Sequence, residues 1–91
     1  MNPKEIVGVR QQLKLGQTEL ASLMGVHPMT VSRWERGLVP PTGYQSAMLT
    51  EFKTAARDKA FRDTFSAALI ATGIMSGLYL LLGAARKEKR R

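Results

Sequence analysis

The chain has 91 residues and a formal net charge of +7, with no cysteine and one histidine. This length suggests one small domain with at most a short appendage. The absence of cysteine excludes a disulfide framework and a thiolate metal site. The sequence also has no cluster of carboxylates from which an acid–base centre could be built. We therefore expect no enzyme, no metal and no cofactor. The polar N-terminus, MNPKEIVGVR, is unlike a secretory signal and favours the cytoplasm.

The positive charge is unevenly distributed. The last six residues, Arg86 to Arg91, include five basic residues and one acidic residue, which is more than half of the net charge. A basic chain suits a polyanionic partner. Because most of the excess lies in a terminal run, however, overall charge is weak support for a nucleic-acid partner.

A first helix is predicted to begin at Asn2 or Pro3. Three apolar residues follow at helical spacing and give this helix a buried stripe: Ile6, Val9 and Leu13.

The next stretch, GQTELASLMGVHPMTVSRWERG at residues 16–37, has the pattern of two short helices joined by a tight turn. Leu20, Ala21 and Met24 share one face of the first of these helices. Gly25 ends it, because glycine adopts a left-handed backbone conformation without steric cost.

The second short helix begins at Pro28, and its buried side is formed by Val31 and Trp34, three residues apart. Gly37 ends it, and Pro40-Pro41 prevents its continuation. Its outward face carries side chains that are unusual for a packing helix and suit a helix that enters a groove: Met29, Thr30, Ser32, Arg33 and Arg36.

This run resembles the helix-turn-helix of the Cro and phage-repressor type, often called the XRE family. The resemblance covers roughly residues 6–52, with no gap. It is carried by Arg10, Leu13, Gln17, Leu20-Ala21, Met24-Gly25-Val26, Thr30-Val31-Ser32 and Trp34-Glu35-Arg36-Gly37. It implies an all-α, lambda-repressor-like domain in a sequence-specific DNA-binding regulator. It also implies a structural ion pair between Arg10 and Glu35.

By family position, the base-reading residues are Met29, Thr30, Ser32 and Arg33, with Pro28 beside them. Arg33 is the strongest candidate, because its guanidinium can donate two hydrogen bonds to guanine. Met29 suits a thymine methyl group or the space beneath the turn equally well.

Four further residues are expected at the DNA backbone: Lys14, Gln17, His27 and Arg36. A solvated first-turn glutamine is nearly as good an interpretation of Gln17. His27 occupies the position before Pro28, so it is expected to cap the helix or face a phosphate rather than bind a metal.

A loop at residues 38–42 is predicted to lead into a further helix that begins at Thr42 or Gly43. The expected inward stripe of that helix is Tyr44, Met48, Phe52 and either Ala55 or Ala56.

The segment Phe65–Ala85 contains 21 residues without charge, which is long enough to cross a bilayer. Polar and glycine residues dilute it, however, and basic residues flank both of its ends. We therefore favour self-association or packing on the domain over a membrane anchor. The predicted division is a DNA-binding domain at 1–56, an apolar helical segment at 57–85 and a basic tail at 86–91.

The favoured function is a phage- or plasmid-like transcriptional repressor that binds double-stranded operator DNA as a homodimer. One alternative is an antitoxin that represses its own operon and binds a toxin through Phe65–Ala85. Another is a protein anchored in the inner membrane and facing the cytoplasm. A third is a fold kept for protein–protein contact alone.

Overall fold

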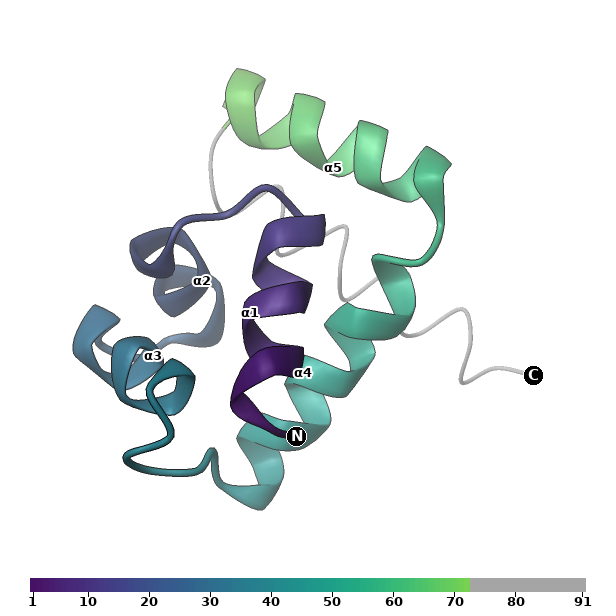
Figure 1. Cartoon of the computed structure of the whole chain (residues 1–91). Coiled ribbons are helices and arrows are strands. Elements are labelled where there is room, and N and C mark those ends of the chain that lie inside the picture. The colour runs from purple at the N-terminus through teal and green to yellow at the C-terminus, as the bar shows by residue number, and fades with distance from the viewer. Residues whose placement is uncertain (73–91) are drawn as a thin grey trace.

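The computed structural model describes residues 1–72, which form five α-helices and no strand. The helices are α1 (Pro3–Gln12), α2 (Gln17–Met24), α3 (Pro28–Glu35), α4 (Gly43–Ala55) and α5 (Lys59–Thr72), shown in Figure 1. The all-α prediction is therefore confirmed for this part of the chain. The predicted apolar helix continues beyond it, into residues 73–85, which lie outside the described residues.

The helices begin where side chains satisfy free backbone N–H groups. The Asn2 side chain accepts from the Glu5 N–H at 2.8 Å, and the Glu5 carboxylate accepts from the Asn2 N–H at 3.0 Å. Thr42 and Gln45 make the same reciprocal pair at the start of α4. Each reciprocal pair is a capping box: it satisfies two backbone N–H donors that have no carbonyl partner within the helix, and so it fixes where the helix begins.

The turn between α2 and α3 forms as its glycine predicts. Gly25 has φ of 70°, in the left-handed region, and the Val26 N–H donates to the Ala21 carbonyl at 3.0 Å. Gly37 has φ of 73° just beyond α3. Both helices therefore end in a left-handed backbone conformation that residues other than glycine rarely adopt.

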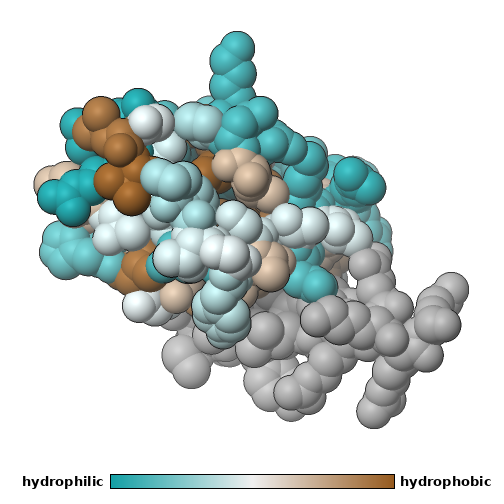
Figure 2. Space-filling model, turned by 90° about the horizontal axis from the view of Figure 1, so that it is seen from below, coloured by the Kyte–Doolittle hydropathy of each residue, from teal (hydrophilic) through white to brown (hydrophobic). Residues whose placement is uncertain are grey.

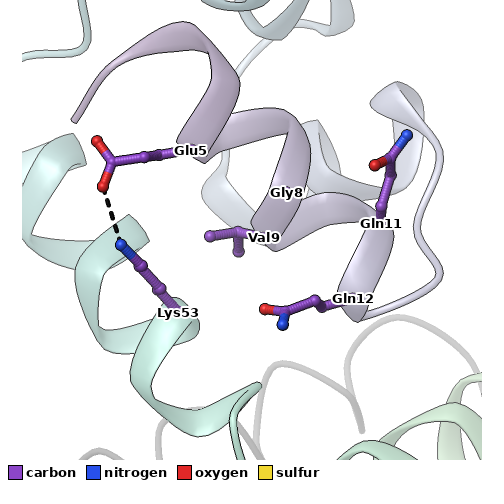
Figure 3. A pocket seen from close by; sticks show the side chains of 6 residues that line it. All are labelled: Glu5, Gly8, Val9, Gln11, Gln12 and Lys53. Carbon is purple, nitrogen blue, oxygen red and sulfur yellow. Dashed lines mark hydrogen bonds and ion pairs between the residues drawn. The ribbon is translucent and has the colours of Figure 1, made fainter.

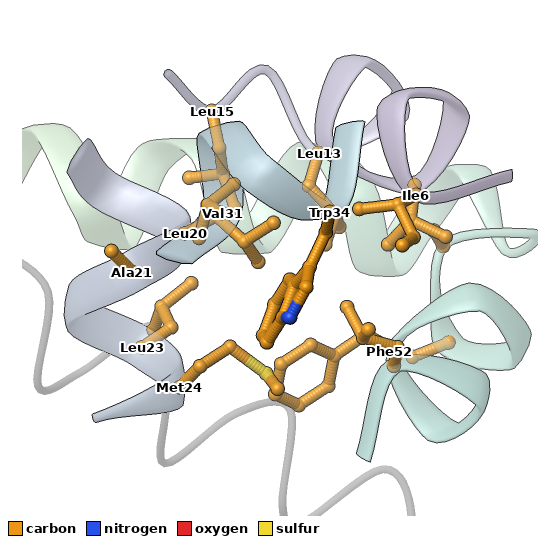
Figure 4. Close-up of a cluster of buried hydrophobic side chains, with 14 of the residues drawn as sticks. Ile6, Leu13, Leu15, Leu20, Ala21, Leu23, Met24, Val31, Trp34 and Phe52 are labelled. Atoms are coloured by element: carbon orange, nitrogen blue, oxygen red, sulfur yellow. The ribbon is translucent and has the colours of Figure 1, made fainter. Parts of the chain in front are cut away.

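The core lies between α1, α2, α3 and α4, with Trp34 among its largest members. Figure 4 shows the indole of Trp34 pointing between Met24 of α2 and Phe52 of α4. Trp34 is 1% exposed, so its predicted core role is confirmed. The predicted stripe of α1 is also fully buried: Ile6, Val9 and Leu13.

The predicted inward face of α4 is wrong at one position. Tyr44 is 76% exposed, whereas Leu49, which the prediction omitted, is completely buried beside Phe52. A stripe that steps by four residues rotates about 40° per step around a helix of 3.6 residues per turn. Two such steps turn Tyr44 away from the buried face on which Phe52 lies. Leu49, three residues before Phe52, lies nearer to that face.

Helix α5 packs back onto the helical bundle, across the end where α1 leads into α2 (Figure 1). Phe65 is fully buried in the same core cluster as Trp34, and Phe61 stacks on it with ring centroids 5.8 Å apart. The Arg62 guanidinium donates to the carbonyl of Ala56 and so ties α5 to the end of α4. The first two turns of α5 thus complete the core of the helical bundle.

Candidate nucleic-acid interface

Helix α3 presents a continuous outward face. Met29 is 47% exposed, Arg33 and Arg36 are exposed, and Thr30 and Ser32 are half-buried. On the opposite side, Val31 and Trp34 are buried at 0% and 1% exposure. The outward side chains are therefore carried on a helix whose inner face is fixed by packing against α2 and α1.

His27 caps this helix. Its Nδ1 accepts a hydrogen bond from the Met29 N–H at 3.0 Å. Because Nδ1 accepts, the ring proton lies on Nε2, on a side chain that is exposed to solvent. The capping role expected for His27 is present, and one ring N–H is left over for an outside acceptor.

A hydrogen-bonded cluster ties α1 and α2 to the end of α3. The Arg10 Nε and Nη2 donate to the two carboxylate oxygens of Glu35 at 2.7 and 3.0 Å, and the Gln17 amide also donates to Glu35 at 3.0 Å. Arg10 further donates to the Leu15 carbonyl at 3.1 Å. The paired geometry implied for Arg10 and Glu35 by the family resemblance is therefore present.

The ionisation of this cluster follows from its surroundings. Burial of Glu35 disfavours its charged form, but the hydrogen bonds from Arg10 and Gln17, with the positive charge of Arg10, outweigh burial and lower the pKa of Glu35. The hydrogen bond to Glu35 raises the pKa of Arg10. Both groups are thus charged at neutral pH, so the pair is electrostatically matched in a place where water is largely excluded.

Gln17 is the residue whose surroundings differ most from the prediction. We expected its amide to face either a DNA phosphate or solvent, and the structure places that amide on Glu35, 18 positions away in the chain. No spacing rule within α2 could have revealed this contact, because it depends on how α2 and α3 cross. A phosphate contact of Gln17 stays a prediction.

Lys14 lies in the link between α1 and α2 and is exposed. Its φ of 58° is in the left-handed region, where a residue with a Cβ is strained. This conformation places an exposed lysine at the corner where the chain turns toward α2.

The Arg36 side chain folds back along α3. Its Nε lies 3.4 Å from the Ser32 carbonyl oxygen and its Nη2 lies 3.9 Å from the Met29 sulfur. The guanidinium therefore borders the same outward face as Met29 and Ser32. Arg33, in contrast, makes none of these contacts within the helix.

A hollow of about 430 Å³ lies away from α3, between α1 and α4 (Figure 3). An ion pair of 2.8 Å between Glu5 and Lys53 spans one side of it, and its other lining residues include Gln11 and Gln12.

Within residues 1–72, no group of His, Cys, Asp or Glu side chains could hold a metal ion.

Comparison with known proteins agrees with this geometry. Residues 9–44 match a family model described as helix-turn-helix. The match runs from α1 through α2 and α3 to the start of α4, which is the part held together by Arg10 and Glu35. No curated protein and no solved structure matches the chain.

Residues 9–44 are thus similar to helix-turn-helix DNA-binding domains. The match is to a helix-turn-helix of the Cro and phage-repressor (XRE) type, and it supports a role in DNA binding and transcriptional regulation of that kind.

In the described part of the chain, no helix is both long enough and apolar enough to cross a membrane. Residues 73–85, which hold most of the uncharged segment, lie outside the described residues.

Proposed function

We propose that the protein is a repressor that binds operator DNA as a dimer, with α3 in the major groove. The supporting observation is the two-sided character of α3. Its inner side chains are fully buried, and its outer side chains are free to meet base edges. A major groove admits one α-helix, and residues in its N-terminal half reach the bases.

In this proposal the base-reading residues are Met29, Thr30, Ser32 and Arg33. Arg33 carries most of the discrimination, since a bidentate arginine–guanine contact is worth about 1–3 kcal/mol. Thr30 and Ser32 offer hydroxyl groups, and Met29 offers an apolar surface to a thymine methyl group.

Lys14, Gln17, His27 and Arg36 would contact phosphates and position the domain without reading sequence. His27 suits this role through its outward Nε2–H, which lies at the N-terminus of α3. Backbone N–H groups there also favour an anion.

Repression is the proposed mode because a domain of this size acts most simply by occupying a promoter. The expected compartment is the cytoplasm, where the DNA is.

The division into a DNA-binding domain at 1–56, an apolar segment at 57–85 and a basic tail at 86–91 remains part of the proposal, with α5 joined to the domain through Phe65.

Selection of bound duplexes from random DNA, using the full chain, tests the proposal. A consensus sequence should emerge. The double variant Ser32→Ala, Arg33→Ala should bind all duplexes with nearly equal affinity while remaining helical. Arg36→Ala is the matched control, because it should weaken every duplex similarly and lower the salt slope by about 1. Recovery of no preferred sequence by the unmodified protein would contradict the proposal.

A further inference from the structure

Met29 is a methionine held at the surface of α3. Its side chain is 47% exposed, whereas Met24 on α2 is 8% exposed and Met48 on α4 is half-buried. Figure 2 looks at the molecule from below and shows apolar and hydrophilic side chains next to one another on the side where α3 lies in Figure 1. A thioether that only filled space in the core would be covered, so packing does not explain why methionine stands at this position.

The backbone around Met29 keeps its side chain at the start of α3. The Met29 N–H donates to Nδ1 of His27 at 3.0 Å, and the ring of Pro28 fixes the φ of the residue before it. Met29 therefore lies in the first helical turn, in the half of the helix that reaches base edges when a helix enters the major groove. In the free protein the sulfur is open to solvent, and in the proposed complex the DNA covers it.

The sulfur of Met29 also lies beside a charged donor. Nη2 of Arg36 is 3.9 Å from it, and Nε of Arg36 is 3.4 Å from the Ser32 carbonyl oxygen. A thioether is a weak hydrogen-bond acceptor, so a guanidinium in this position remains available to a phosphate. A sulfoxide is polar, and an oxygen added to this sulfur would accept a hydrogen bond strengthened by the positive charge of Arg36.

We propose that Met29 is a site of reversible oxidation that controls DNA binding by α3. The oxidant is hydrogen peroxide: the sulfur takes one oxygen atom, the O–O bond breaks and water leaves. The sulfur gives up an electron pair and the peroxide is reduced. A dithiol-dependent reductase reverses the change, because the oxygen leaves as water while the dithiol becomes a disulfide.

The inference rests on the proposed DNA binding by α3 and adds regulation to it. Oxidation replaces the apolar surface that suits a thymine methyl group with a polar oxygen that this methyl group cannot satisfy. The same oxygen draws the Arg36 guanidinium away from the DNA backbone. The oxidised protein should therefore lose one base contact and one phosphate contact.

The test treats the full chain with hydrogen peroxide, locates the added oxygen by peptide mass spectrometry, and measures affinity for a duplex recovered by selection. Each protein is compared with its own untreated sample, so a change caused by a substitution itself does not enter. Met29→Leu removes the sulfur and keeps an apolar side chain of similar size. Met48→Leu is the matched control, because it removes a half-buried thioether from α4.

In the unmodified protein, Met29 should be oxidised before Met24 and Met48. At physiological ionic strength the selected duplex should slow this reaction, and a scrambled duplex should not. Oxidation should weaken binding by roughly tenfold, the usual order of effect for one lost base contact, and the reductase should restore it. Met48→Leu should respond in the same way, whereas Met29→Leu should keep its affinity within about twofold after treatment.

The salt dependence of binding tests the part assigned to Arg36. Oxidation of the unmodified protein should lower the salt slope by about 1, because one phosphate contact is lost. In Arg36→Ala, which lacks that contact from the start, oxidation should leave the slope unchanged. Circular dichroism should show the same helix content before and after treatment.

Full affinity after oxidation of Met29 would overturn the inference, and so would an equal loss of affinity in treated Met29→Leu, which keeps every other methionine. Oxidation of Met29 no faster than that of Met48, or loss of helix content on treatment, would also overturn it. Failure of the proposed function is a different result: the untreated, unmodified protein would then bind the selected duplex no better than a scrambled one.

Discussion

Arg10 and Glu35, 25 positions apart in the chain, are joined by two parallel hydrogen bonds of 2.7 and 3.0 Å. Their side chains are 19% and 7% exposed, so the pair is largely removed from water. It connects α1 to the last residue of α3 and thereby restrains the far end of the helix that presents Arg33. The pair belongs to the framework of the interface, and it affects DNA binding through the position of α3.

We expect Arg10→Ala to destabilise the fold by about 3 kcal/mol, because it leaves the Glu35 carboxylate buried without its counter-charge. Urea unfolding followed by circular dichroism measures this change. Lys53→Ala is the matched control, since its ion pair with Glu5 is more exposed, with both side chains more than one-third accessible. That variant should lose no more than about 1 kcal/mol. Equal effects in the two variants would contradict the framework role of Arg10.

Stability should fall at acid pH in part through Glu35. Its pKa in the folded protein lies below the ordinary value of 4.5, so Glu35 stabilises the folded state fully above that value. This contribution is lost as the pH falls through the lower folded pKa, where the carboxylate takes up a proton.

The free energy of unfolding, measured from pH 7 down to pH 3, should therefore fall less steeply in Glu35→Gln than in the unmodified protein. Glutamine keeps the size of the side chain and one acceptor but has no proton to take up in this range. Parallel curves for the two proteins would show that Glu35 does not contribute to acid sensitivity.

The native Lys14 is expected to lower the stability of the fold and to strengthen DNA binding. Its φ of 58° is strained for lysine, so Lys14→Gly should stabilise the fold by about 1 kcal/mol. The same change removes a proposed phosphate contact and should lower the salt slope of DNA binding by about 1. Thermal unfolding and a salt titration of DNA affinity measure the two effects on one sample.

The control for this backbone argument is Gly25→Ala. Gly25 has φ of 70°, and an added Cβ would meet no atom within 4 Å. Any loss of stability, expected at about 1 kcal/mol, would come from the left-handed conformation alone. A neutral result there would remove the basis for the predicted gain in Lys14→Gly.

Phe65→Ala tests whether α5 belongs to the domain. Phe65 is fully buried in the core cluster, so its removal should cost about 3–5 kcal/mol. Ile70→Ala, on the exposed side of the same helix, should change stability by less than about 0.5 kcal/mol. If both variants unfold at the urea concentration of the unmodified protein, then α5 does not pack on the bundle in solution.

Much of the fold could be predicted from the residues alone, because local rules decide it. Pro28 and Gly25 specify the start of one helix and the end of another through backbone conformation, and Asn2 and Thr42 cap helices through hydrogen bonds to residues three positions on. The burial of Val31 and Trp34 follows from helical spacing. The helix-turn-helix pattern and its outward face are therefore readable in chain order.

Only the tertiary structure decided which helices meet and which faces they cover. Tyr44 has the spacing of a core residue, but it lies in the first turn of α4, turned away from the face that Phe52 buries, whereas Leu49 is on that face. Gln17 donates to Glu35 because α2 and α3 cross there, and Phe65 joins the core because α5 folds back across the bundle. Spacing along one helix determines which residues share a face, whereas the burial of that face depends on contacts between segments distant in the chain.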